Sequence, residues 1–233
     1  MGYLLLYEVI EETISLKLPF LILVTVSFVN LNIFSVAYGQ QQTASTNANI
    51  PNEGAPKPIV HVIIEGTENA DKIKGGDGND KISGNNGDDT LNGGLGKDKI
   101  FGNDGNDKLN GELGDDEIEG GEGNDNIKGE GGDDQLIGDE GDDKLDAGKG
   151  NDELGGGTGI DILKGGDGND ELNGGNNNDE LNGGEGKDKL KGGKGADTFI
   201  CDVADKILDF KSAEGDNKIG ECSVTDKSLP SLP

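Results

Sequence analysis

The sequence predicts an all-β fold built by repetition, in which short strands coil upon one another without forming a conventional core. Residues 66 to 200 form fifteen units of nine residues without an insertion or deletion, and the eighth position of each unit is a large apolar residue, from Ile73 to Phe199. Hydrophobic residues are only 30% of the 233-residue chain and aromatic residues 4%. A compact enzyme of this length needs more than that, which leaves a coil of repeats or a disordered chain.

Charge excludes several classes of partner and enzyme. The chain has 47 acidic residues, a formal net charge of -27, and lysine as its sole cationic residue type apart from His61. Without arginine it lacks the guanidinium fork that holds phosphate, and its negative surplus repels nucleic acid, which we exclude as a partner. One histidine is too few for an HExxH zinc site or a multi-histidine metal site. No nucleophile elbow or Walker loop is present, so we expect no catalytic residue, no organic cofactor and no enzyme.

The amino-terminal segment predicts export. An apolar run occupies residues 18 to 29, and the small residues Ala37 and Gly39 stand where a signal peptidase cuts. We therefore expect a signal peptide over residues 1 to 39. The alternative is that residues 18 to 38 remain as a membrane anchor, since about 20 residues span a bilayer. Both readings place the rest of the chain outside the cytosol, either secreted or at the cell surface.

Between this segment and the repeats lie a spacer and one strand. Residues 40 to 58 are rich in Gln, Thr, Ser, Asn and Pro, which predicts a flexible linker. Residues 59 to 65 then predict an amino-terminal capping strand. His61 in this strand is expected to be a half-buried packing residue without a chemical role.

Glycine and aspartate hold fixed places within each repeat. The first position is Gly except at Ala147, and the fourth is Gly except at Asn69 and Asn177. Asn is the residue that best tolerates positive φ after Gly, so these exceptions agree with a turn at the fourth position. The sixth position is always aspartate: Asp71, Asp80, Asp89, Asp98, Asp107, Asp116, Asp125, Asp134, Asp143, Asp152, Asp161, Asp170, Asp179, Asp188 and Asp197.

This composition requires a ligand for folding. Burial of one apolar side chain per nine residues cannot offset the conformational entropy lost when those nine residues become ordered. Gly-rich turns let backbone carbonyls point at one centre, and the aspartate completes an all-oxygen site. Such donors suit calcium, whereas zinc prefers nitrogen or sulfur. Simple disorder would not explain an apolar residue that always stands two places after the aspartate.

The pattern resembles the RTX (repeats-in-toxin, hemolysin-type) calcium-binding nonapeptide G-G-x-G-x-D-x-U-x, where U is a large apolar residue. The resemblance covers residues 66 to 200 and implies a right-handed parallel β-roll, a β-solenoid in which two units make one coil and calcium lies between turns. It also implies that the sixth-position aspartates are the metal ligands. Fifteen turns stacked in two columns would offer at most about 13 sites. Weak binding or none is expected for units with Lys97, Ile160, Lys187 or Ala196 at position five, and for the terminal Asp71 and Asp197.

The carboxyl-terminal residues 201 to 233 predict a short cap. The nine-residue phase stops after Phe199, and a D-x-I-x-D-F segment at residues 205 to 210 resembles the one that closes the roll in RTX proteases and lipases. A solenoid needs such a cap over its last coil. We expect Cys201 and Cys222 to form a disulfide within it, the alternative being a reactive thiol pair.

Together these features predict a calcium-binding protein, secreted or at the cell surface, whose β-roll folds on binding extracellular calcium. We expect it to serve a structural or adhesive role, with calcium ions and cell-surface or matrix components as partners. The alternative is a non-catalytic remnant or partner subunit of an RTX toxin or secreted hydrolase. A face that binds ice or polysaccharide is disfavoured, because the outward seventh and ninth positions mix Lys, Glu, Asn and Ile instead of forming a threonine ladder.

Overall fold

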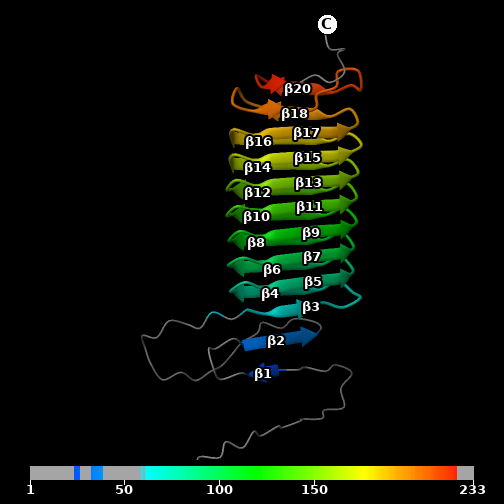
Figure 1. Ribbon diagram of the computed structural model, residues 1–233. Helices are drawn as coiled ribbons and strands as arrows, with labels where there is room; N and C mark the ends of the chain where they lie inside the picture. The colour runs from blue at the N-terminus through cyan, green and yellow to red at the C-terminus, as the bar shows by residue number, and fades with distance from the viewer. Residues whose placement is uncertain (1–23, 27–32, 39–58, 60, 225–233) are drawn as a thin grey trace, which may run out of the picture.

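A computed structural model of the chain describes residues 24–26, 33–38, 59 and 61–224. All regular structure in these residues is β-strand, arranged as a solenoid (Figure 1), and the predicted all-β parallel roll is confirmed. No helix in the described residues is long and apolar enough to cross a membrane. Most of the predicted signal peptide, 1 to 39, and the predicted linker, 40 to 58, lie outside the described residues.

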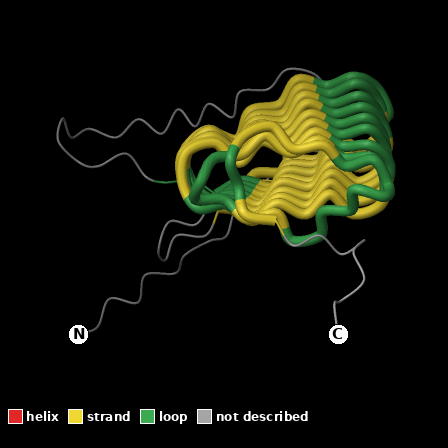
Figure 2. Tube along the Cα trace, turned by 90° about the horizontal axis from the view of Figure 1, so that it is seen from above, coloured by secondary structure: helices red, strands yellow, loops and turns green. Residues whose placement is uncertain are grey.

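The repeats supply strands alternately to two sheets. The long sheet has twelve strands in the order β1-β2-β3-β5-β7-β9-β11-β13-β15-β17-β19-β21, and the short sheet has nine in the order β20-β18-β16-β14-β12-β10-β8-β6-β4. Figure 2 shows them as two stacked layers joined by turns. The strands within the repeats are β4 (Lys72–Asp77), β5 (Lys81–Asn86), β6 (Thr90–Leu95), β7 (Lys99–Asp104), β8 (Lys108–Leu113), β9 (Glu117–Glu122), β10 (Asn126–Gly131), β11 (Gln135–Glu140), β12 (Lys144–Lys149), β13 (Glu153–Thr158), β14 (Ile162–Gly168), β15 (Glu171–Asn176), β16 (Glu180–Gly186) and β17 (Lys189–Lys194).

The register makes one coil from two units. Strands of one sheet pair in parallel with partners 18 residues away, as Ile82 with Ile100 and Leu136 with Leu154. Like positions therefore stack directly above one another along the whole roll. Every side chain of the repeat belongs to a column of equivalent side chains, and any property of one unit is repeated along the axis.

The strands are longer than the sequence suggests. Only positions seven to nine, such as residues 81 to 83, have side chains suited to a strand, yet β5 continues to Asn86. The pairing of Asn85 with Asn103 shows why, because the backbone of the glycine-rich positions keeps its register with the next coil. Side-chain preference underestimates a strand whose partner is a nearly identical copy of itself.

Three positions of each unit face inward. The sixth, eighth and first positions are buried, while the seventh lies exposed between them, which follows from the two-residue alternation of a strand. Eighth-position side chains from Ile82 to Phe199 are at most 1% exposed and form one continuous column of apolar contacts. Ile73 is only partly buried because β4 is the edge strand of the short sheet.

Additional strands extend the long sheet at the amino-terminal end. β3 (Ile63–Glu65) pairs in parallel with β5, and it is shorter than the predicted strand of residues 59 to 65. β2 (Ile33–Tyr38) pairs in parallel with β3, and β1 (Val24–Val26) pairs antiparallel with β2. The short sheet has no such extension within the described residues, so its edge strand at this end is β4.

The coil continues into the carboxyl-terminal segment although the nine-residue phase has ended. β18 (Thr198–Cys201), β19 (Lys206–Ile207), β20 (Asn217–Gly220) and β21 (Ser223–Val224) each pair with a strand of the coil before. Ile207 pairs with Leu190 and is fully buried, so it occupies an eighth position at an offset of 17 residues instead of 18.

The end of the roll is closed by an aromatic contact and a disulfide. The ring of Phe210 lies 6.2 Å from that of Phe199 and packs against the apolar column. Cys201 and Cys222 form a disulfide with their Cα atoms 5.7 Å apart. Ile219 is 53% exposed, so it contributes little to this closure.

Candidate metal centre

The sixth-position aspartates lie inside the turns. Asp71 is 8% exposed, and the other fourteen are 3% exposed or less. They end the turn that connects two strands, and their side chains point back across it. Fifteen buried carboxylates in a chain with so little apolar core require compensation, because a buried charge is costly unless it is paired, hydrogen-bonded or bound to metal.

One oxygen of each of these carboxylates from Asp80 to Asp197 is used by the fold. Oδ1 accepts a hydrogen bond from the backbone N–H of the residue one coil earlier, as when Asp98 N–H donates to Asp116 at 2.8 Å and Asp116 N–H to Asp134 at 2.8 Å. There are two such ladders, one for each column of turns. One begins where Val62 N–H donates to Asp80 and ends at Asp205, and the other begins where Asp71 N–H donates to Asp89 and ends at Asp216. Aspartate is therefore needed partly for structure, since it satisfies a buried donor of the neighbouring turn.

The other oxygen is buried without a partner in the central turns. Oδ2 has no hydrogen-bond donor, although a buried acceptor left unpaired destabilises a fold by about 1–3 kcal/mol. The thirteen aspartates with this orphaned oxygen are Asp80, Asp89, Asp98, Asp107, Asp116, Asp125, Asp134, Asp143, Asp152, Asp161, Asp170, Asp179 and Asp188. Such a repeated defect indicates a ligand that supplies positive charge.

A backbone carbonyl meets this orphaned oxygen at the first-position glycine. A Cβ placed on Gly75 would lie within 3.0 Å of both Asp80 Oδ2 and the carbonyl oxygen of Gly93 in the next coil. The same pair of oxygens surrounds Gly102, Gly120, Gly138, Gly156 and Gly174. Two acceptors converge there with no donor between them, and this all-oxygen arrangement fits calcium. No three Cys, His, Asp or Glu side chains of the described residues cluster for a metal, so a site would use carbonyls as well as carboxylates.

The terminal aspartates differ. Asp71 Oδ2 accepts hydrogen bonds from the backbone N–H of Thr67 at 2.5 Å and from its hydroxyl at 2.9 Å. Asp205, which takes the sixth position after the repeats, accepts from Asp202 N–H at 2.7 Å through the same oxygen. One column of turns thus begins at Asp71, and the other ends at Asp205, with a carboxylate whose second oxygen accepts from a donor of its own turn. Asp197 is buried but is not among the thirteen with an orphaned oxygen.

Burial makes the central carboxylates weak acids in the absence of metal. Loss of solvent, together with a smaller effect of neighbouring aspartates in the column, raises the pKa of Asp98, Asp134, Asp143 and Asp179 to about 7. The same burial raises the pKa of Asp89, Asp116 and Asp125 to about 6. A divalent cation would relieve both the desolvation and the mutual repulsion, which is the electrostatic condition for a metal site.

Backbone geometry explains the glycines of the turn and reveals one position that sequence reasoning missed. The fourth position has positive φ, as in Gly78 at 129° and Asn177 at 78°, but Asn69 in the first unit does not. The second position also has positive φ, and there the chain places Glu112 at 77° and Glu130 at 75°. The frequent glycines at the second position are the sequence signal for this conformation.

The fifth position forms a second ladder on the surface. The side-chain oxygen of Asn106 accepts from Asn124 N–H at 2.9 Å, and that of Asn124 accepts from Asp142 N–H at 2.8 Å. His61 opens one column by accepting from Asn79 N–H through Nδ1, which gives this half-buried side chain a capping contact. This ladder was not predicted from the sequence, because each acceptor and its donor lie 18 residues apart.

Comparison with known protein families agrees with this geometry. The RTX calcium-binding nonapeptide repeat matches residues 65–100, 83–118, 93–127, 119–154, 155–190 and 173–200, which together cover more than half of the chain. The chain belongs to this family. RTX repeats bind calcium, so the stacked turns are those of a calcium-binding β-roll, as the sequence predicted. No curated protein matches the chain.

Proposed function

We propose that this RTX protein is a non-catalytic structural or adhesive component whose roll folds when it meets extracellular calcium. The observation that carries the proposal is the set of thirteen buried Oδ2 atoms without a donor, stacked in two columns of turns. Without a cation the roll would bury these acceptors and their charges uncompensated. With calcium the same atoms become ligands, and binding free energy becomes folding free energy.

The proposed ligands follow from the two kinds of turn. In each central turn Oδ2 of the sixth-position aspartate and a first-position carbonyl of the next coil, as in Asp134 with the carbonyl of Ala147, would hold one ion. Asp71 is proposed not to bind, since Thr67 already occupies its free oxygen. Bound calcium would supply the positive charge that the turns lack and would leave the exposed strand faces unchanged.

The proposed location rests on the amino-terminal segment and on the family. RTX repeats occur typically in secreted proteins, and the apolar run at residues 18 to 29 suits export. Calcium is abundant outside cells, where modules of moderate affinity, with dissociation constants of about 10⁻⁴ to 10⁻³ M, are occupied. The chain would therefore remain unfolded during export and fold after it.

Calcium titration of the chelated chain tests the proposal. Far-ultraviolet circular dichroism should show a cooperative gain of β structure, and isothermal titration calorimetry should count close to one ion per central turn. Magnesium at the same concentration is the control and should have little effect, because it requires stricter octahedral geometry. A chain with the same spectrum in chelator and in calcium would contradict the proposal.

A further inference from the structure

The outward faces of the two sheets differ in charge over part of their length, since the long sheet also carries lysines on β5, β7 and β17 and the short sheet a glutamate on β16. On β4 to β14 of the short sheet, the exposed seventh and ninth positions include one acid, Asp146, and these lysines: Lys72, Lys74, Lys108, Lys128, Lys144 and Lys164. On β9 to β15 of the long sheet, the same positions include no lysine and these acids: Glu117, Glu119, Glu153 and Glu171. We call them the lysine face and the glutamate face.

Local ion pairs leave part of each face uncompensated. Position two adds Glu112 and Glu130 to the lysine face, where they pair with Lys74 at 3.4 Å and Lys128 at 3.5 Å. Lys108, Lys144 and Lys164 form no ion pair within residues 61–224.

On the glutamate face Glu117 pairs with Lys99 and Glu171 pairs with Lys189 at 3.0 Å. Glu119 and Glu153 form no ion pair with another described residue. Three lysines on one face and two glutamates on the other are thus open to a partner.

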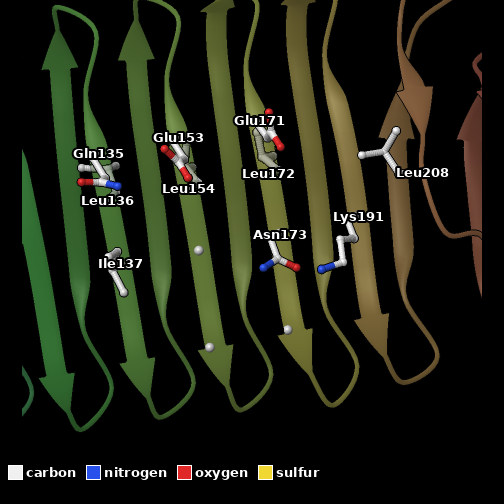
Figure 3. A pocket seen from close by; sticks show the side chains of 13 residues that line it. Gln135, Leu136, Ile137, Glu153, Leu154, Glu171, Leu172, Asn173, Lys191 and Leu208 are labelled. Carbon is white, nitrogen blue, oxygen red and sulfur yellow. The ribbon is translucent and has the colours of Figure 1, made fainter.

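The glutamate face is hollowed beside Glu153. Gly155 occupies a ninth position there, and a Cβ on it would have no atom within 4 Å. The recess has a volume of about 460 Å³ and is bordered by Ile137, Asn173 and Lys191 along the ninth-position column (Figure 3). At the end away from Lys191 the recess offers the carboxylate of Glu153 and the apolar wall of Ile137, which suit the cationic end and the long apolar stem of a lysine.

We propose that the lysine face of one copy docks on the glutamate face of a second copy. The two faces have the same strand spacing, about 4.8 Å, because they belong to one solenoid, so their charge columns match in period. β12 and β14 lie in the same coils as β13 and β15, and the strands of the two sheets run in opposite directions (Figure 1). A copy displaced perpendicular to the sheets without axial shift would therefore bring Lys164, the third residue of β14, to the recess beside Glu153. A second copy matches both faces at once, whereas an acidic polymer would match only the lysine face.

The contact joins different surfaces of the two copies, so it does not produce a closed dimer. Each added copy leaves one lysine face and one glutamate face open, and the product is a row of parallel rods. This proposal rests on the proposed calcium binding, because unneutralised turns would repel one another in a chain of charge -27. Calcium in the turns removes that repulsion and leaves the two faces to attract each other.

Sedimentation velocity of the full chain in calcium tests the contact. The weight-average mass should rise by ~2-fold or more with protein concentration, and it should fall when ionic strength rises from about 0.1 M to about 1 M, which shortens the screening length from about 10 Å to about 3 Å. Circular dichroism of the same samples reports folding separately. A chain that gains no β structure with calcium would overturn the proposed function, whereas a folded chain that stays monomeric would overturn this contact alone.

Charge reversal identifies the faces. Lys144→Glu with Lys164→Glu should abolish association, and so should Glu119→Lys with Glu153→Lys, while a mixture of the two double variants should associate again because each reversed face meets a complementary one. The matched controls are Lys149→Glu with Lys194→Glu and Glu122→Lys with Glu140→Lys, at exposed third positions where the chain already uses both residue types. These controls should associate like the original chain. Association that survives both face reversals would show that calcium bridges or another surface joins the copies.

Discussion

The central turns and the terminal turns use the same aspartate in different ways. In the central turns and at Asp205, Oδ1 accepts a backbone hydrogen bond from the preceding coil. In the central turns Oδ2 is orphaned, as in Asp134, whereas at the ends Thr67 donates to Asp71 and Asp202 to Asp205. The comparison shows that the second carboxylate oxygen is left for a ligand in the central turns, whereas at Asp71 and Asp205 it is already hydrogen-bonded.

The largest expected effect comes from pH in the absence of metal. Burial raises the pKa of central aspartates such as Asp98 and Asp143 to about 7 from an ordinary value of 3.8. Protonation therefore favours the folded state, and this stabilisation is fully present below about pH 4 and is lost as pH rises through about 6 to 7. In chelator the chain should gain β structure on acidification from about pH 8 to about pH 5, a limit that stays above its pI of 4.1.

Circular dichroism across this range, with and without calcium, checks the prediction. With calcium the chain should be folded at neutral pH, and acid should release the ions as protons replace them on the central carboxylates. A chelated chain that is equally unfolded at about pH 5 and at about pH 8 would show that the central carboxylates do not oppose folding in their charged form.

Removal of the disulfide should loosen one end and leave the centre intact. Cys201 and Cys222 enclose a loop whose closure stabilises a fold by about 3 kcal/mol in the chain-entropy model. Replacing both with Ser should speed amide hydrogen exchange in β18 to β21. Exchange in β9 to β13 should not change, because each coil contacts only its neighbours. Equal acceleration throughout would indicate that the roll unfolds only as a whole.

Neutralising one aspartate should reduce calcium binding in a central turn but not in the first, terminal turn. Asp134→Asn keeps the Oδ1 acceptor but removes the charge at Oδ2, so calorimetry should count one ion fewer per chain or a loss of about tenfold in affinity at that turn, about 1.4 kcal/mol. Asp71→Asn is the matched control and should leave the ion count unchanged. If both substitutions removed an ion, the hydrogen bonds from Thr67 would not prevent Asp71 from binding calcium.

The smallest expected effect concerns the backbone of the turn. Glu130 has φ of 75°, a conformation that costs a residue with a Cβ about 1–2 kcal/mol, while glycine loses about 0.5–1 kcal/mol more entropy on folding. Glu130→Gly should therefore stabilise the calcium-bound roll by less than about 1 kcal/mol in thermal unfolding. Thr67→Gly, at the same position of the first unit but without positive φ, should stabilise nothing and should weaken the hydrogen bonding of Asp71.

The sequence was sufficient for the features that each unit carries by itself. The apolar eighth position predicts the inward-facing side chains, and the glycines and the sixth-position aspartate predict the turn. Both predictions are possible because strand alternation and glycine-rich turns are properties of a single nine-residue unit. The hydrogen bond of Asp116 to Asp98 and the ladder of Asn106 and Asn124 were not predictable, since they join atoms 18 residues apart. Asp205 and Ile207 keep the D-x-U spacing after the phase shift, but the sequence predicted only a cap there, and the further turn of the coil was not predicted.

The aspartate ladder gives the roll a direction of assembly. The buried N–H of each sixth-position residue finds its acceptor only in the coil that follows, as Asp188 does in Asp205 and Asp197 in Asp216. A polypeptide that emerges amino end first must therefore leave its newest coil with a bare donor until 18 more residues have appeared. Truncation at the carboxyl end would uncover such donors, whereas truncation at the amino end would uncover carboxylate oxygens that water readily solvates. The roll should therefore tolerate the loss of coils at its amino end better than the loss of coils at its carboxyl end.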